Sequence, residues 1–270
     1  STLSSSSAAS DVYKRQMESV THHLIGVKSV KETVSAGQYA KLVRSCIEQI
    51  NSRGKIPILC GGAGLYFRAL NSGIFDQSKS ELKIRKNLED LYDGGNAQDM
   101  MNTLKKIDPE YYMHVHINNK KRLIRALEIY EGTGKTPSEH FKNQKNKPAP
   151  NLNLFSVYLN WDRSELRDRI SKRTAAMIKN GWIDEVKKII EKYPGVNLHP
   201  LDSIGYRQIV SYLNNNISLE CLESEINTKT YQYAVRQIKW FKKENMNLII
   251  KMNSGTITSQ IVKKILSCIN

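Results

Sequence analysis

Long apolar runs are missing from this sequence of 270 residues, and so is any excess of acidic side chains. No stretch reaches the roughly 18 consecutive apolar residues that a membrane-spanning helix requires. The sequence also shows no segment with the charged, apolar and small-residue regions of a secretory signal peptide. We therefore expect a protein that does not enter a membrane.

Cysteine is sparse, and its four residues lie far apart at Cys46, Cys60, Cys221 and Cys268. No C-x-x-C pair and no Cys/His spacing of a metal site occurs, which argues against structural zinc. Cys46 and Cys60 fall on apolar faces of the elements predicted below, so we expect them to be reduced, buried thiols. Such thiols are typical of a cytoplasmic protein.

Common patterns of catalytic proton transfer are missing as well. The sequence contains no Ser–His–Asp set, no pair of carboxylates and no H-E-x-x-H. A phosphate-binding P-loop needs G-x-x-x-x-G-K-[ST]. The nearest match ends at Gly134-Lys135-Thr136, but Ile129 stands where the first glycine belongs. We interpret Gly132 and Gly134 as a helix end followed by a turn.

Positive charge, in contrast, is plentiful. Lys and Arg number 41 against 26 Asp and Glu, which gives a formal net charge of +15. An excess of this size favours a polyanionic partner, nucleic acid above all. A surface that only keeps the protein in solution is the plain alternative. An anionic membrane surface is a weaker one, because no basic amphipathic helix with a strong apolar face stands out.

One stretch, Ile56–Leu70, joins an apolar run to three glycines. Residues 56–60 have the composition of a buried strand in a parallel sheet. Gly61, Gly62 and Gly64 would then turn the chain into a helix. A strand, a glycine turn and a helix N-terminus can present backbone N–H groups to an anion or to the edge of a substrate. A tight turn without a ligand fits the same residues, so both interpretations stay open.

Periodicity in the rest of the chain predicts an α/β fold. Ser35 and Gln38 have the spacing of a capping box, ahead of an amphipathic helix that Gly54 would end. Apolar residues predict strands at 154–161 and 247–252. Asp162 would cap the helix that follows the first of these strands. A last long helix runs through residues 233–241.

The middle of the chain has a different character. Residues 76–149 are rich in polar side chains and show helical patterns at 82–92, 99–107 and 119–130, without a convincing buried strand. We expect them to form a helical insertion domain, and residues 17–75 and 150–270 to form an α/β core domain. Residues 1–16 look like a linker or a cloning scar and are expected to lie outside the fold.

Two basic segments are candidates for contact with nucleic acid. Within Lys120–Arg125, Arg122 and Arg125 are three residues apart and share one side of a helix, which suits phosphate contacts. Arg236–Trp240 combines a cation, an amide and an aromatic ring that could stack on an unstacked base. The alternatives are a solvated helix face and, for Trp240, a place in the core.

Six segments, taken in order, resemble blocks of the tRNA dimethylallyltransferase family, the tRNA N6-isopentenyltransferases. They are HHLI at 22–25, GGAGLYFRAL at 61–70, RLIRALEIYEGTGKT at 122–136, RISKRTAAMIKNGWIDEV at 169–186, SIGYRQ at 203–208 and YAVRQIKWF at 233–241. The resemblance extends over about residues 17–250.

The resemblance implies transfer of a dimethylallyl group from dimethylallyl diphosphate to N6 of the adenine next to the anticodon (position 37) of tRNA. It implies a P-loop-NTPase-like parallel sheet flanked by helices. Mg²⁺ and cationic groups would stabilise the departing diphosphate, and a carboxylate would help to deprotonate the amine. The target base would have to leave the anticodon-loop stack. The implied partners are tRNA and dimethylallyl diphosphate, and the implied enzyme is a cytoplasmic monomer.

By position, Arg173 matches the helix arginine that approaches the diphosphate in this family, and it is the catalytic residue that the resemblance implies here. Ala63 stands at the substrate-facing third position of the glycine loop. Arg85 matches a tRNA-contacting arginine of the insertion. The substrate- and tRNA-binding residues implied in this way are Gly61, Gly62, Ala63, Arg85, Lys121, Arg122, Leu123, Ile124, Arg125, Ser203, Ile204, Gly205, Tyr206, Arg207, Arg236, Gln237, Ile238, Lys239 and Trp240.

The sequence departs from the family pattern at several places. Its P-loop, GPTxxGK[ST], which supplies the Mg²⁺ ligand, and the Asp-Ser motif with the catalytic carboxylate are not found. Ala63 replaces a threonine, and Val235 replaces a basic residue. We therefore expect a fragment that is inactive alone.

Two other functions stay open. One is a tRNA-binding module without catalysis, and the other is an adenylate isopentenyltransferase that acts on free nucleotides. The helical insertion and the positive charge favour tRNA, since a free nucleotide needs no extended basic surface.

Overall fold

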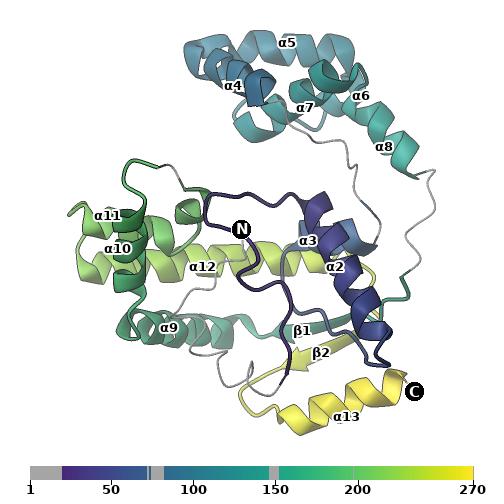
Figure 1. Cartoon of the computed structure of the whole chain (residues 1–270), viewed down its shortest axis with the longest axis vertical. Helices are drawn as coiled ribbons and strands as arrows, with labels where there is room; N and C mark the ends of the chain where they lie inside the picture. The colour runs from purple at the N-terminus through teal and green to yellow at the C-terminus, as the bar shows by residue number, and fades with distance from the viewer. Residues whose placement is uncertain (1–19, 72, 74–81, 146–151, 197, 270) are drawn as a thin grey trace. The chain divides into compact units, whose positions relative to one another are not determined.

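The structure is a computed structural model, and it describes residues 20–71, 73, 82–145, 152–196 and 198–269. The leader expected at residues 1–16 and the domain boundaries expected near residues 75 and 149 lie outside these ranges. The chain forms two compact units, one made of Ser1–Phe67 with Leu152–Asn270 and the other of Arg68–Asn151 (Figure 1).

The first unit combines a small sheet with long helices. Its elements are α2 (Ala36–Asn51), the first half of α3 (Gly64–Asn71), β1 (Val157–Trp161), α9 (Arg163–Lys179), α10 (Trp182–Lys192), η2 (His199–Asp202), α11 (Tyr206–Leu213), α12 (Leu219–Phe241), β2 (Leu248–Met252) and α13 (Thr258–Ile269). None of the helices in the described part of the chain is long and apolar enough to cross a membrane.

Strands β1 and β2 are parallel, in a register that pairs Val157 with Leu248 and Trp161 with Met252. Parallel strands need a crossover connection, which the helices between β1 and β2 provide. This arrangement confirms the predicted α/β class with a parallel sheet. Both strands lie within the segments that the sequence indicated.

The strand predicted at residues 56–60 is wrong. No strand is present there, and Ile56 and Ile58 are 77% and 84% exposed. An apolar run becomes a strand only when a neighbour accepts and donates its backbone hydrogen bonds, and Pro57 removes one donor from the run. The buried thiols expected at Cys46 and Cys60 are not found either, because Cys46 is half-buried and Cys60 is exposed.

Local signals at helix ends are confirmed. Ser35 and Gln38 close the capping box of α2, and Gly54 has a φ of 66° just beyond the end of this helix. Asp162 caps α9 by accepting a hydrogen bond from the backbone N–H of Ser164 at 2.8 Å. These short-range hydrogen bonds need no tertiary context, which is why spacing alone predicts them.

All the regular elements in the described part of the second unit are helices. It contains α4 (Leu82–Leu91), the π-helical turn η1 (Tyr92–Asn96), α5 (Ala97–Ile107), α6 (Pro109–Tyr112), α7 (Lys120–Thr133) and α8 (Pro137–Lys145). Its core joins α4, α5 and α7, with Leu104 and Leu123 fully buried. Gly134, with a φ of 68°, caps the end of α7, so the Gly132–Thr136 segment is a helix end rather than a phosphate loop.

A second apolar core lies in the first unit, where α10 and α11 pack on the N-terminal half of α12. Trp182, Val186, Ile209, Leu222 and Ile226 form its centre. Figure 1 shows α12 extending from this helix pair toward α3. The C-terminal half of α12 is therefore placed beside the glycine-rich stretch.

Candidate functional site

The glycine loop, residues Gly61–Gly64, rests on the C-terminal half of α12. The side-chain amide of Gln237 donates a hydrogen bond to the carbonyl of Gly62 at 2.7 Å. Ala63 is exposed, and its carbonyl accepts hydrogen bonds from the N–H groups of Tyr66 and Phe67, both at 3.0 Å. The loop is thus continuous with the first turn of α3 and fastened to α12.

Two glycines of this loop make room for α12. A Cβ atom on Gly62 would overlap the amide nitrogen of Gln237, and one on Gly64 would overlap the ring of Trp240. At Gly61 a Cβ would meet open space. At Gly62 and Gly64 the close approach to the backbone is made by side chains of α12.

The segment Arg236–Trp240 divides between outward and inward side chains. Arg236 and Lys239 are exposed, and the guanidinium of Arg236 lies 5.8 Å from the ring centroid of Tyr233. Ile238 is buried. Trp240 packs edge-on against Phe67, with ring centroids 6.2 Å apart. The alternative of a packing role for Trp240 is therefore the arrangement that the structure shows.

Arg173 is exposed on α9, and its side chain has no ion pair or hydrogen bond among the described residues. A second arginine of the same face, Arg169, stacks on the ring of Trp161 at 4.0 Å from its centroid. Such stacking holds a guanidinium in one orientation. Arg173 is the less constrained cation of the two.

Helices α9 and α12 pack side by side and run antiparallel (Figure 1). The guanidinium of Arg167 lies over the ring of Tyr231 at 4.2 Å, whereas the far end of α9 packs against the core that contains the start of α12. Arg173, six residues after Arg167, therefore lies level with a position about six residues before Tyr231 in α12. The turn that holds Gln237 is displaced from it along the axes by about twelve residues, or roughly 18 Å at 1.5 Å per residue.

The segment Ser203–Arg207 mainly joins α11 to α10. A Cβ atom on Gly205, whose φ is 92°, would overlap the ring of Trp182. Tyr206 is buried and donates its hydroxyl hydrogen to Glu185 at 2.7 Å. Arg207 is exposed, and its guanidinium donates to the carbonyl of Asp202 at 3.0 Å. Ser203 and Ile204 are half-buried, so Arg207 is the most accessible of the five side chains.

Helix α7 of the second unit presents basic side chains outward and apolar ones inward. Leu123 and Ile124 are 0% and 2% exposed, so neither side chain reaches the surface where a ligand would bind. Lys121 and Arg122 are exposed, and Arg122 donates to the carbonyl of His114 at 3.0 Å. The buried members of the matched block pack in the core of the unit, and the exposed cations remain as candidates for contact with RNA.

Glu128 is a partner of this surface that the sequence analysis missed. It is 3% exposed and accepts a hydrogen bond from the partly exposed guanidinium of Arg125 at 2.8 Å. The signal that could have found it is the spacing of three residues on one helix face. On α4, Arg85 is similarly tied to Glu89 at 2.9 Å, with both side chains partly exposed.

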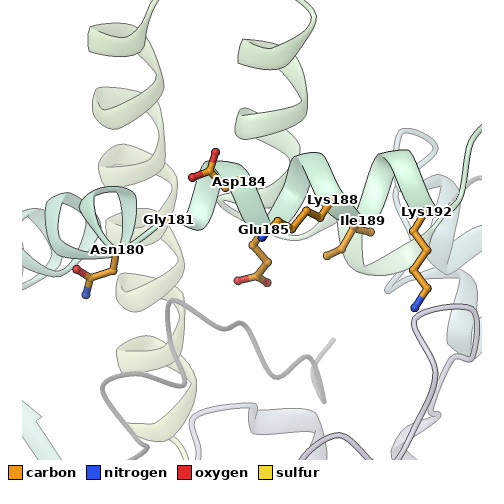
Figure 2. Close-up of a pocket in the computed structure, with 7 residues that line it drawn as sticks. All are labelled: Asn180, Gly181, Asp184, Glu185, Lys188, Ile189 and Lys192. Carbon is orange, nitrogen blue, oxygen red and sulfur yellow. The ribbon is translucent and has the colours of Figure 1, made fainter.

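A shallow hollow lies on α10. Figure 2 shows its lining at the junction of α9 and α10, and this lining consists of Asn180, Gly181, Asp184, Glu185, Lys188, Ile189 and Lys192. Charges of both signs lie there, and Glu185 is already engaged by Tyr206. None of the catalytic or binding residues implied by the family resemblance lines it, although four of its lining residues belong to the matched block at 169–186.

The Mg²⁺ expected from the resemblance finds no matching ligand set. Among the residues that the structure describes, no group of three or more His, Cys, Asp or Glu side chains could hold a metal ion. Mg²⁺ in proteins is bound through carboxylates and substrate phosphates in near-octahedral geometry. The described side chains do not fit such a site, so no step is assigned to this ion.

Comparison with known proteins gives one consistent result. The family model described as IPP transferase matches residues 8–244. The chain is 34% identical over 252 residues to a tRNA dimethylallyltransferase of Oceanobacillus iheyensis, covering 93% of this chain and 79% of that protein. It is 36% identical over 231 residues to a tRNA dimethylallyltransferase of Christiangramia forsetii, covering 86% and 75% of the two chains.

Solved structures agree with the sequence comparisons. The crystal structure of a full-length tRNA isopentenylpyrophosphate transferase from Bacillus halodurans matches 97% of this chain and 81% of its own, with a TM-score of 0.65 and 29% identity. A eukaryotic dimethylallyltransferase, described as acting on tRNA, matches 94% of this chain and 67% of its own, with a TM-score of 0.76 and 27% identity. The chain therefore belongs to the IPP transferase family, the prenyltransferases known as tRNA dimethylallyltransferases.

Proposed function

We propose that this chain binds tRNA for the transfer of a dimethylallyl group from dimethylallyl diphosphate to N6 of the adenine at position 37. One observation supports this most directly. Arg236 and Lys239 are exposed on the same turns of α12 whose Gln237 and Trp240 hold the glycine loop. Cations that bind a phosphate backbone would thereby place RNA next to the loop that the family resemblance assigns to the substrate.

The second unit contributes its own basic surface to the proposal. Lys121, Arg122 and Arg125 project from α7, and Arg85 from α4, which packs against it. Phosphate contacts of this kind position RNA without specifying its sequence. We propose that the helical unit grips the RNA backbone, while the unit with the glycine loop receives the adenine.

Arg173 is the residue that we propose for the chemistry. Its exposed guanidinium can donate to the oxygens of a diphosphate and stabilise the charge that develops when the carbon–oxygen bond breaks. The adenine must be extruded from the anticodon loop before its N6 can attack. The described residues supply no assigned base for the proton of this amine.

We propose that the protein acts as a monomer, as the family resemblance implies. Its four cysteines are free, and three of them are exposed. Free, exposed thiols persist in a reducing compartment, which supports the cytoplasm as the place of action.

Binding of an anticodon stem–loop tests the proposal against its alternatives. We expect the 270-residue chain to bind a hairpin with adenine at position 37, and a large excess of AMP to leave this binding unchanged. Displacement by AMP would favour the adenylate isopentenyltransferase. Absence of RNA binding by the folded chain would contradict the proposal.

A transfer assay separates binding from catalysis. We propose that this polypeptide alone binds tRNA without modifying it, because its sequence contains no G-x-x-x-x-G-K-[ST] loop to hold the diphosphate. With radiolabelled dimethylallyl diphosphate and unmodified tRNA, we expect no label in the RNA fraction. Clear turnover would show that other residues of this chain bind the diphosphate.

A further inference from the structure

The contact between Gln237 and Gly62 joins residues that are 175 positions apart in the sequence. The carbonyl of Gly62 can only accept, so the amide nitrogen of Gln237 must be the atom that faces it. A side chain on Gly62 would occupy the place of that nitrogen. The bond therefore depends on an amide at one end and on a glycine at the other.

A second contact, one helical turn further along, fastens the same loop. Gly64 lies against the ring of Trp240, and Phe67 meets Phe241 with ring centroids 5.8 Å apart. Residues three and four positions apart share a helix face, so Gln237, Trp240 and Phe241 line the side of α12 that holds the loop.

Arg236 and Lys239 lie one position before Gln237 and Trp240, and both are exposed. One step along a helix rotates the side chain by about 100°. The cations therefore occupy a face adjacent to the one that holds the glycine loop. The face that would bind RNA phosphates and the face that holds the glycine loop therefore belong to the same two turns of α12.

We propose that Gln237 is a positioning residue that locks the glycine loop onto α12, rather than a residue that contacts RNA. Its amide keeps the loop and the exposed cations of α12 in a fixed relation, so that RNA bound by Arg236 and Lys239 meets a loop already in place. This inference deepens the proposed function and rests on it for the identity of the RNA.

Hydrogen–deuterium exchange of the full chain tests the lock without RNA. Gln237→Glu keeps the length of the side chain, removes the donor and sets carboxylate oxygens against the carbonyl of Gly62. Gln232→Glu is the matched control, because Gln232 is an exposed glutamine of the same helix and the charge change is identical. We expect the exchange rate in peptides covering residues 58–67 to rise about 2- to 10-fold in Gln237→Glu and to stay unchanged in Gln232→Glu. This range corresponds to the free energy of one lost hydrogen bond. Unchanged exchange there would overturn the lock.

A double-mutant cycle supplies the second test and does not depend on the glutamate. Gly62→Ala displaces the amide of Gln237, so it should open the loop in the wild-type background. In a Gln237→Ala background, where the bond is already lost, Gly62→Ala should cause little further increase in loop exchange. Additive effects of the two substitutions on loop exchange would overturn the lock.

Binding of the anticodon hairpin then distinguishes a positioning role of Gln237 from direct contact of Gln237 with RNA. We expect Gln237→Glu and Gln232→Glu to weaken binding of the anticodon hairpin to a similar extent, because both add one negative charge to α12. A much larger loss in Gln237→Glu with normal loop exchange would identify Gln237 as an RNA contact and overturn the proposal. If the wild-type chain does not bind the hairpin at all, the proposed function fails, while the exchange experiments still decide the lock.

Discussion

Gly64 shows at the level of one residue how a missing side chain determines a contact. The ring of Trp240 occupies the place where a Cβ atom would lie, whereas the neighbouring Gly61 faces open space. Glycine spacing in the sequence indicates a turn but cannot tell which partner makes the close approach. That partner is about 175 residues away along the chain.

Substitution of these two glycines gives a matched prediction. Gly64→Ala should destabilise the unit that contains the glycine loop by about 1–3 kcal/mol, the usual cost of inserting a methyl group into a packed contact. Gly61→Ala should change its stability by less than about 0.5 kcal/mol. Urea denaturation followed by tryptophan fluorescence measures both, since Trp161, Trp182 and Trp240 all lie in this unit. Equal effects of the two variants would contradict the packing of Trp240 on Gly64.

Single residues within matched blocks also differ in what they can do. Leu123, Ile124 and Ile238 belong to segments that the family resemblance assigns to tRNA, yet their side chains are buried. A resemblance identifies a segment, and burial decides which of its side chains can touch a ligand.

Helix α7 is the element in which packing and binding can be separated. Leu123→Ala should destabilise the helical unit by about 2–5 kcal/mol, because it leaves a cavity at a fully buried position. Lys121→Gln should leave stability within about 0.5 kcal/mol and weaken hairpin binding, since its side chain is exposed. Exchange of the α4–α7 peptides in urea reports the stability. Normal RNA affinity in Lys121→Gln would remove this residue from the proposed surface.

A buried histidine at the junction of α7 and α8 predicts that the stability of the helical unit depends on pH. His140 is buried and shares a hydrogen bond of 2.9 Å with Thr133, and burial, with a smaller effect of Lys135, lowers its pKa below the usual value. The folded form then resists protonation that the unfolded chain accepts from about pH 6.5 downward. Stability of the helical unit should therefore fall as the pH drops from 6.5 toward the lowered pKa.

The variant His140→Gln provides the control for this pH effect. It retains a polar side chain of similar reach but cannot be protonated. Denaturation midpoints of the helical unit at several pH values between 7 and 5 should decline in the wild type and decline less in the variant. Identical slopes would show that another group causes the pH dependence.

Among the elements, the helix ends fixed by local signals and the strands β1 and β2 were predictable from the sequence, whereas the absence of a strand at residues 56–60 was not. The capping box at Ser35 and the glycine that ends α7 depend on neighbours within a few residues. Residues 56–60 have a strand-like composition, but β1 and β2 pair with each other and leave this run outside the ladder of the described sheet. Pairing partners far along the chain cannot be inferred from composition alone.

At the scale of the whole molecule, the net charge and the family both point to a polyanionic partner. A net charge of +15 indicated a polyanionic partner before any fold was known, and the family comparisons agree with that indication. The docking of the glycine loop on α12 required the structure. Sequence alone therefore located the candidate site in terms of segments but not of contacts.

The dependence of tRNA binding on salt tests the central claim most directly. Each phosphate neutralised by Lys or Arg releases counterions, so the logarithm of the binding constant should fall linearly with the logarithm of the salt concentration. With several such contacts we expect affinity for tRNA to drop by about 10³-fold or more between 50 and 200 mM salt. Arg236→Gln should reduce the slope by about one. Lys263→Gln, an equal loss of charge on the exposed face of α13, should leave it unchanged. A binding constant that does not change with salt, or equal slopes for the wild type and Arg236→Gln, would contradict this account.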